Sequence, residues 1–256
     1  NATGYNILSI GVPTQGTSIT LQSDNKSIVG GSALQSQNDF LIVRYTTAGA
    51  LDTTFNVVGY NTTSIGSGAQ VNAVKLQSSG DIIAAGTAVS GSPVFALARY
   101  TTAGALDGSF GTSGTTTTSI SVHSVLNDIA IQTDDKIVAV GYAFDGNTTN
   151  FALARYNADG SLDTAGFGTM GIVQTSIGSS SQAQSVYIQT DGKIVVAGYA
   201  TVSDSDVFVV ARYNTDGSLD TTGFNNPNGY VTTAIQNGAE AKSVILQSNG
   251  QIIAAG

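Results

Sequence analysis

A block of about 56 residues recurs along this 256-residue chain, and it limits the folds that the chain can adopt. Five glutamines each follow Leu or Ile and precede Ser or Thr, and a glycine stands nine residues after each of them. The glutamines are Gln22, Gln77, Gln132, Gln189 and Gln247, and the glycines are Gly31, Gly86, Gly141, Gly198 and Gly256. Five copies of one structural unit, the last of them incomplete, therefore extend through the chain.

The first half of each unit predicts a β-hairpin. In one copy, the alternating segment SVYIQ at 185–189 predicts a first strand. The segment TDGK at 190–193 predicts a two-residue turn with positive φ at Asp191 and Gly192. The apolar segment IVVAGY at 194–199 then predicts a second strand that returns antiparallel to the first.

The second half of each unit predicts two more strands. The continuous apolar run of FALARY at 151–156 is typical of a strand buried on both faces, and GYVTTAI at 229–235 predicts a fourth strand. Four antiparallel strands per unit are typical of a β-propeller blade, in which neighbouring blades bury both faces of each small sheet. A β-solenoid is the main alternative, but its coils are shorter and its strands are parallel.

Composition supports one all-β domain. The chain is 41% hydrophobic, only 10% charged and contains 31 glycines, which favours a sizeable core and many short strands joined by turns. We therefore predict a single β-propeller domain that covers residues 1–256. With no cysteine in the sequence, a disulfide framework and a cysteine-based zinc site are excluded.

The two ends of the chain predict an incomplete fifth blade. Residues 4–10, GYNILSI, resemble the fourth strand at 59–65, whereas the C-terminal copy stops at Gly256, the end of a second strand. Four complete blades would run from Ser18 to Ile235, and the remaining pieces of both ends would build a fifth blade that lacks its third strand. Two alternatives stay open: the chain is a segment of a larger propeller, or a neighbouring molecule supplies the missing strand.

The repeated blocks resemble a known family. The segments LARYNADGSLD and QTDGKIVVAGY, with the phenylalanine between them, are similar to the delta-sixty repeat family of predicted bacterial β-propellers. The resemblance covers essentially the whole chain, although the first two copies read TTAGALD at 46–52 and 101–107 and so lack one loop aspartate. It implies a propeller in a large secreted or surface protein, and it implies no established activity.

Every arginine of the chain occupies one recurring position, directly before a tyrosine and four residues after a phenylalanine. A buried guanidinium needs a hydrogen-bonded carboxylate or carbonyl partner, and aspartate suits its planar geometry. We expect structural contacts, within or between blades, between Arg44, Arg99, Arg155 and Arg212 and the loop residues Asp52, Asp107, Asp163 and Asp220. The alternative is a ring of arginines that lines a central channel and binds an anion.

The loops NADGSLD and NTDGSLD hint at calcium. Their ligands would be Asp159 and Asp163 in one copy and Asp216 and Asp220 in the next. Neither loop contains a bidentate glutamate, and Asx-turn and glycine-turn chemistry explains the same residues. No cofactor is therefore expected, with calcium at these loops as the alternative.

No catalytic site stands out. His123, the only histidine, has no counterpart in the other copies, and we expect it in a surface loop before a first strand. A glycosidase would need two carboxylates that face one sugar bond. The carboxylates outside the repeated positions are Asp39, Asp128, Asp145, Asp204, Asp206 and Glu240.

Charge and repeat regularity leave two classes of function. A net charge of −8 without a cluster of Lys and Arg disfavours nucleic acid and anionic membranes as partners, and no apolar run is long enough to cross a bilayer. We expect a non-enzymatic extracellular or cell-surface propeller that binds other copies of itself or surface components, and that could form a fibre through its incomplete blade. The alternative is a propeller hydrolase or lyase that acts on polysaccharide.

Overall fold

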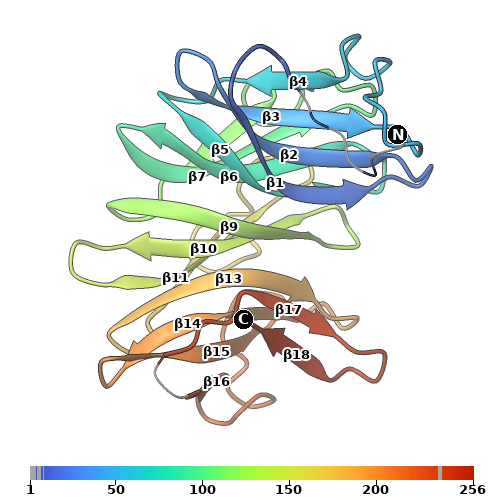
Figure 1. The fold of residues 1–256 in the computed structure, drawn as a ribbon. Coiled ribbons are helices and arrows are strands. Elements are labelled where there is room, and N and C mark those ends of the chain that lie inside the picture. The colour runs from blue at the N-terminus through green and yellow to red at the C-terminus, as the bar shows by residue number, and fades with distance from the viewer. Residues whose placement is uncertain (1–3, 5–6, 8, 236–237) are drawn as a thin grey trace. The chain divides into compact units, whose positions relative to one another are not determined.

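The computed structural model describes residues 4, 7, 9–235 and 238–256. In this part of the chain there are eighteen strands, β1 to β18, and no helix, which confirms the all-β prediction (Figure 1). Accordingly, no helix able to span a bilayer occurs among the described residues. The chain folds into two compact units, Asn1–Thr118 and Ser119–Gly256. A single domain over residues 1–256 therefore stays a prediction.

The first unit contains two antiparallel sheets of four strands in chain order. The first sheet consists of β1 (Thr14–Leu21), β2 (Ser27–Leu34), β3 (Asn38–Tyr45) and β4 (Tyr60–Thr63). The second sheet consists of β5 (Ala69–Leu76), β6 (Ile82–Ser90), β7 (Ser92–Tyr100) and β8 (Thr115–Thr118). Strand β5 lies against β1, β2 and β3, so the two sheets pack face to face. Their shared core joins Phe40 and Ile42 of β3 to Ala96, Ala98 and Tyr100 of β7.

The second unit repeats this arrangement with a third, a fourth and a fifth sheet. The third sheet consists of β9 (His123–Ile131), β10 (Ile137–Phe144), β11 (Thr149–Tyr156) and β12 (Ile172–Thr175). The fourth sheet consists of β13 (Ser180–Ile188), β14 (Ile194–Val202), β15 (Ser205–Tyr213) and β16 (Tyr230–Thr233). Strand β13 lies against β9, β10 and β11, and the core joins Phe151 and Leu153 to Val209, Ala211 and Tyr213.

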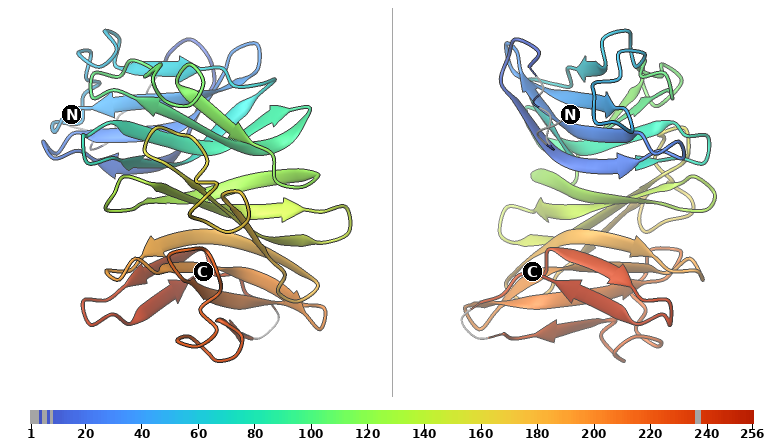
Figure 2. Two further views of the ribbon diagram at one scale, coloured as in Figure 1. Left: turned by 180° about the vertical axis from the view of Figure 1, so that it is seen from behind. Right: turned by 45° about the vertical axis from the view of Figure 1, so that its right-hand side comes forward.

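The fifth sheet has only two strands, β17 (Ser243–Leu246) and β18 (Ile252–Ala255). Strand β17 lies against β13 and β14, so this hairpin covers part of the fourth sheet (Figure 2). The predicted contribution of residues 4–10 to the fifth blade depends on residues 5, 6 and 8, which lie outside the described residues. The structure thus shows four complete sheets and a fifth sheet of two strands.

The turn between the first and second strands differs from the prediction. Only Gly192 has a positive φ, of 82°, and Asp191 does not. The Gly192 N–H donates to the Gln189 carbonyl at 2.9 Å, and the Gln189 N–H donates to the Lys193 carbonyl at 2.8 Å. The connection is therefore a turn closed by one left-handed residue, and the predicted two-residue turn was wrong because the loop is one residue longer.

The repeated glycine of the second strand faces a β-bulge in the first strand. At Gly31, Gly86, Gly141 and Gly198, a side-chain Cβ would overlap a backbone oxygen of that strand, namely of Gln15, Gln70, Val125 and Gln182. The strand register shifts at the same place in all four sheets. Glycine recurs at this position because the bulge brings two backbones too close for any side chain.

Candidate functional site

The structure brings each of the four arginines into contact with the aspartate expected from the sequence. Arginine Nε donates to Oδ2 of that aspartate at 2.8 to 2.9 Å in the pairs Arg44–Asp52, Arg99–Asp107, Arg155–Asp163 and Arg212–Asp220. The backbone directs this contact, because the aspartate N–H donates to the carbonyl of the same arginine at 2.9 Å in every copy. The repeat therefore places the same ion pair at the end of the third strand in each of the four sheets.

A phenylalanine ring lies under each guanidinium. The arginine Cζ lies 4.7 to 5.0 Å from the ring centroids of Phe55, Phe110, Phe167 and Phe224. The first three rings are at most 2% exposed, whereas Phe224 is only half-buried. An arginine, its aspartate and this phenylalanine form the unit that we call the Arg–Asp cluster. Cation–π contact and charge pairing together stabilise the charged guanidinium away from water.

A lysine that the sequence interpretation missed joins three of the clusters. Lys26, Lys136 and Lys193 lie 3.1, 2.9 and 2.6 Å from the aspartate Oδ2 atoms. Each stands four residues after the repeated glutamine, a spacing that could have revealed it. The second sheet has Asp81 at this position, and the Asp107 side chain there is 20% exposed, compared with 8% for Asp163.

The loop between the cluster aspartate and phenylalanine has two lengths, and each length provides a different acceptor for the arginine Nη2. In the first two sheets, Nη2 donates at 3.0 Å to the hydroxyl of Thr54 or Ser109, which also donates to the cluster aspartate. In the later sheets the loop is one residue longer, and Nη2 donates at 2.5 Å to the carbonyl of Gly166 or Gly223. The extra residue therefore replaces a side-chain acceptor by a backbone acceptor.

In each of the two compact units, the Arg–Asp cluster of the first sheet also contacts the following sheet. Arg44 Nη1 donates to the Thr102 carbonyl at 2.8 Å, and Arg155 Nη1 donates to the equivalent Thr215 carbonyl at 2.5 Å. A Cβ on Gly104 would come within 2.8 Å of the Phe55 ring, so this loop glycine packs directly on the ring. Gly217 packs on Phe167 in the same way. These arrangements fasten consecutive sheets to each other.

The cluster carboxylates are held in the ionised state. Hydrogen bonds from Lys136 and Lys193 lower the pKa of Asp163 and Asp220, with a further contribution from the arginines. The Thr54 hydroxyl, followed by Lys26, lowers the pKa of Asp52 far below its usual range, and the Ser109 hydroxyl lowers that of Asp107. Every one of these pKa values moves in the same direction, so acid acts on all four clusters together.

We expect acid to destabilise the protein through these aspartates. Their folded-state pKa values lie below the unfolded-state value of about 3.9, so their stabilisation is complete at neutral pH and is lost as the pH falls below about 4. Urea denaturation at pH 7, 4, 3 and 2 should show a falling midpoint, and Asp163→Asn should make the dependence shallower. A midpoint that stays constant down to pH 2 would contradict this assignment.

The loop aspartates proposed for calcium have local partners. Asp159 Oδ1 accepts from the Ser161 N–H at 2.9 Å, and Asp216 Oδ1 accepts from the Ser218 N–H at 2.9 Å. The paired residues Asp163 and Asp220 point toward arginine and lysine. Among the described residues, no three His, Cys, Asp or Glu side chains gather as metal ligands would. The expectation that no cofactor binds, with calcium at these loops as the alternative, stays a prediction of the sequence.

We expected His123 in a surface loop, and this prediction was wrong. His123 is instead the first residue of strand β9. It pairs with Phe144 of the neighbouring strand β10, and the two rings stack with centroids 5.0 Å apart at an angle of 26°. Phe144 is the only phenylalanine outside the repeated positions. His123 and Phe144, which both lie outside the repeated positions, thus contact each other, which strand pairing decides and the sequence pattern did not show.

Several of the carboxylates outside the repeated positions are buried, hydrogen-bonded or placed in a turn. Asp39 is buried in β3, and Asp128 accepts hydrogen bonds from the Ser185 hydroxyl and the Val186 N–H at 3.1 Å. Asp145 accepts from two backbone N–H groups of its own turn, at Asn147 and Thr148, and these bonds lower its pKa. Asp204 lies in the turn between β14 and β15.

Asp206 and Glu240 lie near the same tyrosine. Burial raises the pKa of Tyr199 to about 12, and the negative charges of Glu240 and Asp206 add to the effect. Lys242 pairs with Glu240, and its Nζ lies 5.5 Å from the Tyr199 ring centroid. The second unit thus contains one small cluster of polar side chains outside the repeated positions.

Sheets of four antiparallel strands, packed face to face and built from one repeated sequence, define the chain as a β-propeller protein. The family model described as "Domain of unknown function (DUF5122) beta-propeller" matches residues 22–55, 77–110, 132–165 and 189–222, more than half of the sequence. The chain therefore belongs to the DUF5122 β-propeller family. Each matched segment begins at a repeated glutamine and includes one arginine.

Solved structures with similar folds include proteins of known and unknown function. A protein of unknown function from Dyadobacter fermentans is similar over 93% of this chain and 74% of its own, with 12% identity and a TM-score of 0.56. For the periplasmic gluconolactonase of Pseudomonas aeruginosa, the shares are 94% and 63%, with 12% identity and a TM-score of 0.52. At this identity the likeness shows the fold alone. No curated protein matches the sequence.

Proposed function

We propose that this chain is a non-enzymatic propeller module of the cell surface or the extracellular space, and that it assembles with other copies through its first and fifth sheets. The observation that carries the proposal is that each of these sheets exposes an apolar residue whose counterparts in the other sheets are buried. Exposed apolar residues on a sheet of this kind favour association with a similar sheet.

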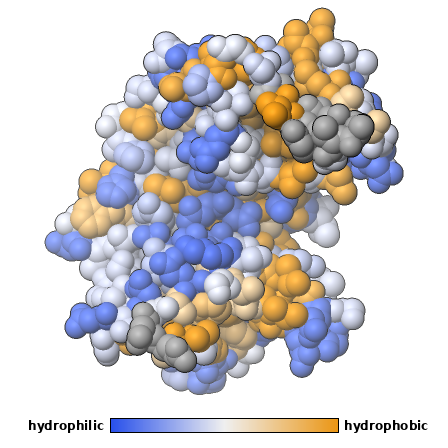
Figure 3. All heavy atoms as spheres, in the orientation of Figure 1, coloured by the Kyte–Doolittle hydropathy of each residue, from blue (hydrophilic) through white to orange (hydrophobic). Residues whose placement is uncertain are grey.

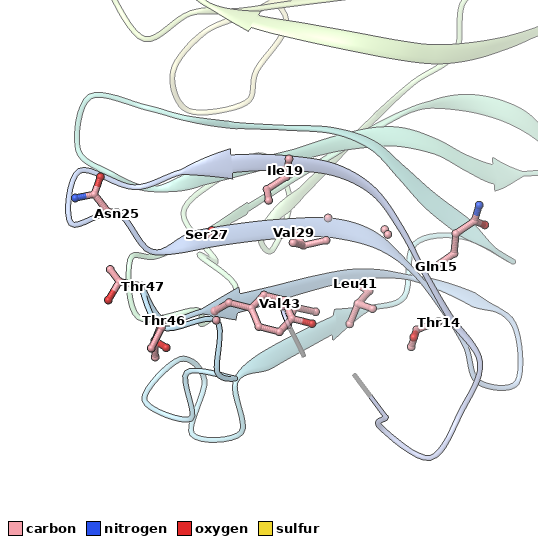
Figure 4. A pocket seen from close by; sticks show the side chains of 17 residues that line it. Thr14, Gln15, Ile19, Asn25, Ser27, Val29, Leu41, Val43, Thr46 and Thr47 are labelled. Atoms are coloured by element: carbon pink, nitrogen blue, oxygen red, sulfur yellow. The ribbon is translucent and has the colours of Figure 1, made fainter. Parts of the chain in front are cut away.

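The first sheet exposes part of the face that its counterparts bury. Ile19 of β1 is 65% exposed, whereas Val74 and Val186, at the same repeat position, are 1% and 7% exposed. A groove of about 660 Å³ lies on this face, and Figure 4 shows Ile19 and Val29 along it, whereas Leu41 and Val43 beside them are buried. In the second sheet the equivalent face packs on the first sheet, so the groove has the shape and chemistry to receive a preceding sheet.

The fifth sheet exposes the face opposite to the one that the first sheet exposes. Ile253 of β18 is 40% exposed, whereas its counterparts Ile28, Ile83 and Val195 are fully buried. Ile245 of β17 is 52% exposed, and apolar surface gathers over this hairpin in the space-filling view (Figure 3). Contact between the fifth sheet of one copy and the first sheet of the next would form a head-to-tail interface, which generates a ring or an open fibre.

We expect the purified chain to associate in a concentration-dependent manner, because head-to-tail contact removes both apolar faces from water. In sedimentation velocity, Ile19→Asp and Ile253→Asp should each reduce the assembly to monomer. Val57→Asp is the matched control, because Val57 is 86% exposed but lies in the loop after β3. A wild-type chain that stays monomeric at every concentration would overturn the proposal.

A second candidate function is supported by the polar cluster around Tyr199. Two carboxylates beside a tyrosine are the kind of groups that a polysaccharide-active propeller would use. Release of reducing ends from a polysaccharide by the wild-type chain, and its loss in Asp206→Asn and Glu240→Gln, would favour the enzyme. The same result would contradict a non-enzymatic role.

A further inference from the structure

We propose that Asn147 is a site of N-linked glycosylation, and that Phe144 packs against the first sugar of the glycan. The site takes an oligosaccharide that is carried on a lipid diphosphate and begins with an N-acetylated sugar. This inference rests on the proposed location at the cell surface or outside the cell, and adds a modification to it. Three observations carry it: a free acceptor amide, an aromatic ring that breaks the repeat, and a threonine directly opposite that ring.

Among the described residues there are three segments of the type Asn-x-Ser/Thr, in which glycans are attached to asparagine. They begin at Asn25, Asn61 and Asn147. The Asn61 amide is occupied, since its Nδ2 donates to the Gly104 carbonyl at 2.8 Å. Asn25 lies in the turn between β1 and β2, and the Lys26 that follows it lies 3.1 Å from the Asp52 carboxylate. Both of these segments therefore take part in the contacts of the fold.

The third segment presents a free amide. Asn147 is exposed in the loop 145–148 between β10 and β11. Asp145 Oδ1 accepts from the N–H groups of Asn147 and Thr148, both at 2.8 Å, so the backbone of the loop is ordered. Asp145 Oδ2 accepts from the side chains of Thr148 and Asn150. The Asn147 side chain makes no hydrogen bond in the described part of the chain, so the loop offers its amide to an enzyme.

An aromatic ring stands at the base of this loop, where the repeat has none. Phe144 is the last residue of β10, three residues before Asn147, and it is only half-buried. The same repeat position is occupied in the other complete sheets by Leu34, Val89 and Thr201. The C–H groups on one face of a sugar ring form an apolar surface, and an aromatic ring offers a matching flat apolar face. A contact with the first sugar therefore gives this unrepeated phenylalanine a role.

Strand pairing places Phe144 between His123 and Thr149. His123 of β9 lies opposite Phe144 on one side, and Thr149 of β11 lies opposite it on the other. The stacked His123 ring, with its centroid 5.0 Å away, restricts the movement of Phe144. Thr149 supplies the hydroxyl that completes the Asn-x-Thr segment. Residues opposite each other on paired strands project to the same face of a sheet, so Phe144 and Thr149 form one platform beside the loop.

Attachment of the glycan is a substitution at the anomeric carbon of the first sugar. An oligosaccharyltransferase binds the Asn-x-Thr segment and the lipid-linked oligosaccharide. The Asn147 Nδ2 forms a bond to the anomeric carbon, while the bond from that carbon to the diphosphate oxygen breaks. The lipid diphosphate leaves with the electron pair, and Nδ2 loses one proton to water. The step needs no oxidant or reductant, and it leaves the first sugar on the loop whose base carries Phe144.

The acceptor is tested on the purified, folded chain. The probe is a single-subunit oligosaccharyltransferase that recognises Asn-x-Ser/Thr, together with a lipid-diphosphate oligosaccharide that begins with N-acetylglucosamine. Mass spectrometry of proteolytic peptides should find the glycan on Asn147, and Asn147→Gln should remove it. Asn61 is the matched internal control and should stay unmodified, because its amide is occupied. A wild-type chain without glycan on Asn147, or with equal occupancy at Asn61, would overturn the proposal.

The role of Phe144 is tested by urea denaturation of the glycosylated and unglycosylated forms of each variant. In the wild type, glycosylation should raise the midpoint and make the unfolding constant about fivefold smaller, the size of an aromatic contact. Phe144→Leu should still accept the glycan, because the enzyme reads the Asn-x-Thr segment, but its midpoint should not rise. Phe144→Tyr keeps a ring and should keep the rise, as should the matched control Val89→Leu in the second sheet. An equal rise in Phe144→Leu and the wild type would overturn the sugar contact.

These experiments separate the glycosylation site from the assembly proposal. The glycan is detected by its mass in any oligomeric state, and each variant is compared with its own unglycosylated form. A chain that is glycosylated on Asn147 but stays monomeric at every concentration would support this site and overturn assembly between copies. A chain that assembles but leaves Asn147 unmodified would do the reverse.

Discussion

Asp163→Ala is expected to lower the free energy of unfolding by about 3 kcal/mol, the order of magnitude found when one partner of a buried ion pair is removed. Asp163 accepts from Arg155 and from Lys136, both at 2.9 Å, and its side chain is only 8% exposed. The substitution leaves two cations without their common anion, one of them on the buried Phe167 ring. Urea denaturation monitored by circular dichroism measures the loss.

Asp107→Ala is the control for this prediction. Asp107 makes the same contact with Arg99, but its side chain is 20% exposed. In addition, Asp81 occupies the position at which three other copies have a lysine. We expect a loss of about 1 kcal/mol, because water compensates a partly exposed charge. Equal losses for the two variants would show that burial and the lysine do not strengthen the cluster.

Gly198→Ala is expected to destabilise the chain by about 3 kcal/mol, at the upper end of the usual cost of overpacking. The added Cβ would overlap the Gln182 carbonyl in the bulge of β13, and only a shift of one strand could relieve the overlap. Two paired backbones share this shift, so the hydrogen bonds beside the bulge are also weakened. The midpoint of urea denaturation should fall accordingly.

The matched control for this substitution is Gly91→Ala. Gly91 also disfavours a side chain, since its φ is 78°, but no atom lies within 4 Å of a Cβ added there. Only backbone strain opposes the change, which costs about 1 kcal/mol. If Gly198→Ala were no more harmful than Gly91→Ala, the bulge would not be the reason for the repeated glycine.

Sequence repetition predicted more than the positions of the strands. Because every copy keeps an arginine and an aspartate at fixed places, one local contact explains both, and the structure places Arg155 and Asp163 in contact as expected. It did not indicate that Lys136 joins the pair, because the lysine belongs to a different hairpin turn. The pairing of His123 with Phe144 was also missed, since strand register brings together residues that share no repeat position.

By itself, the sequence determined the repeat, the four-stranded unit and the residues that build each Arg–Asp cluster, because periodicity and local spacing are properties of one unit. Only the tertiary structure decided which atoms of a cluster reach the next sheet, as Arg44 reaches the Thr102 carbonyl 58 residues away. It also decided which residues stay uncovered, so that Ile19 and Thr233 differ from their counterparts. Burial depends on the neighbour that packs against a residue, and identical repeat positions have different neighbours in different sheets.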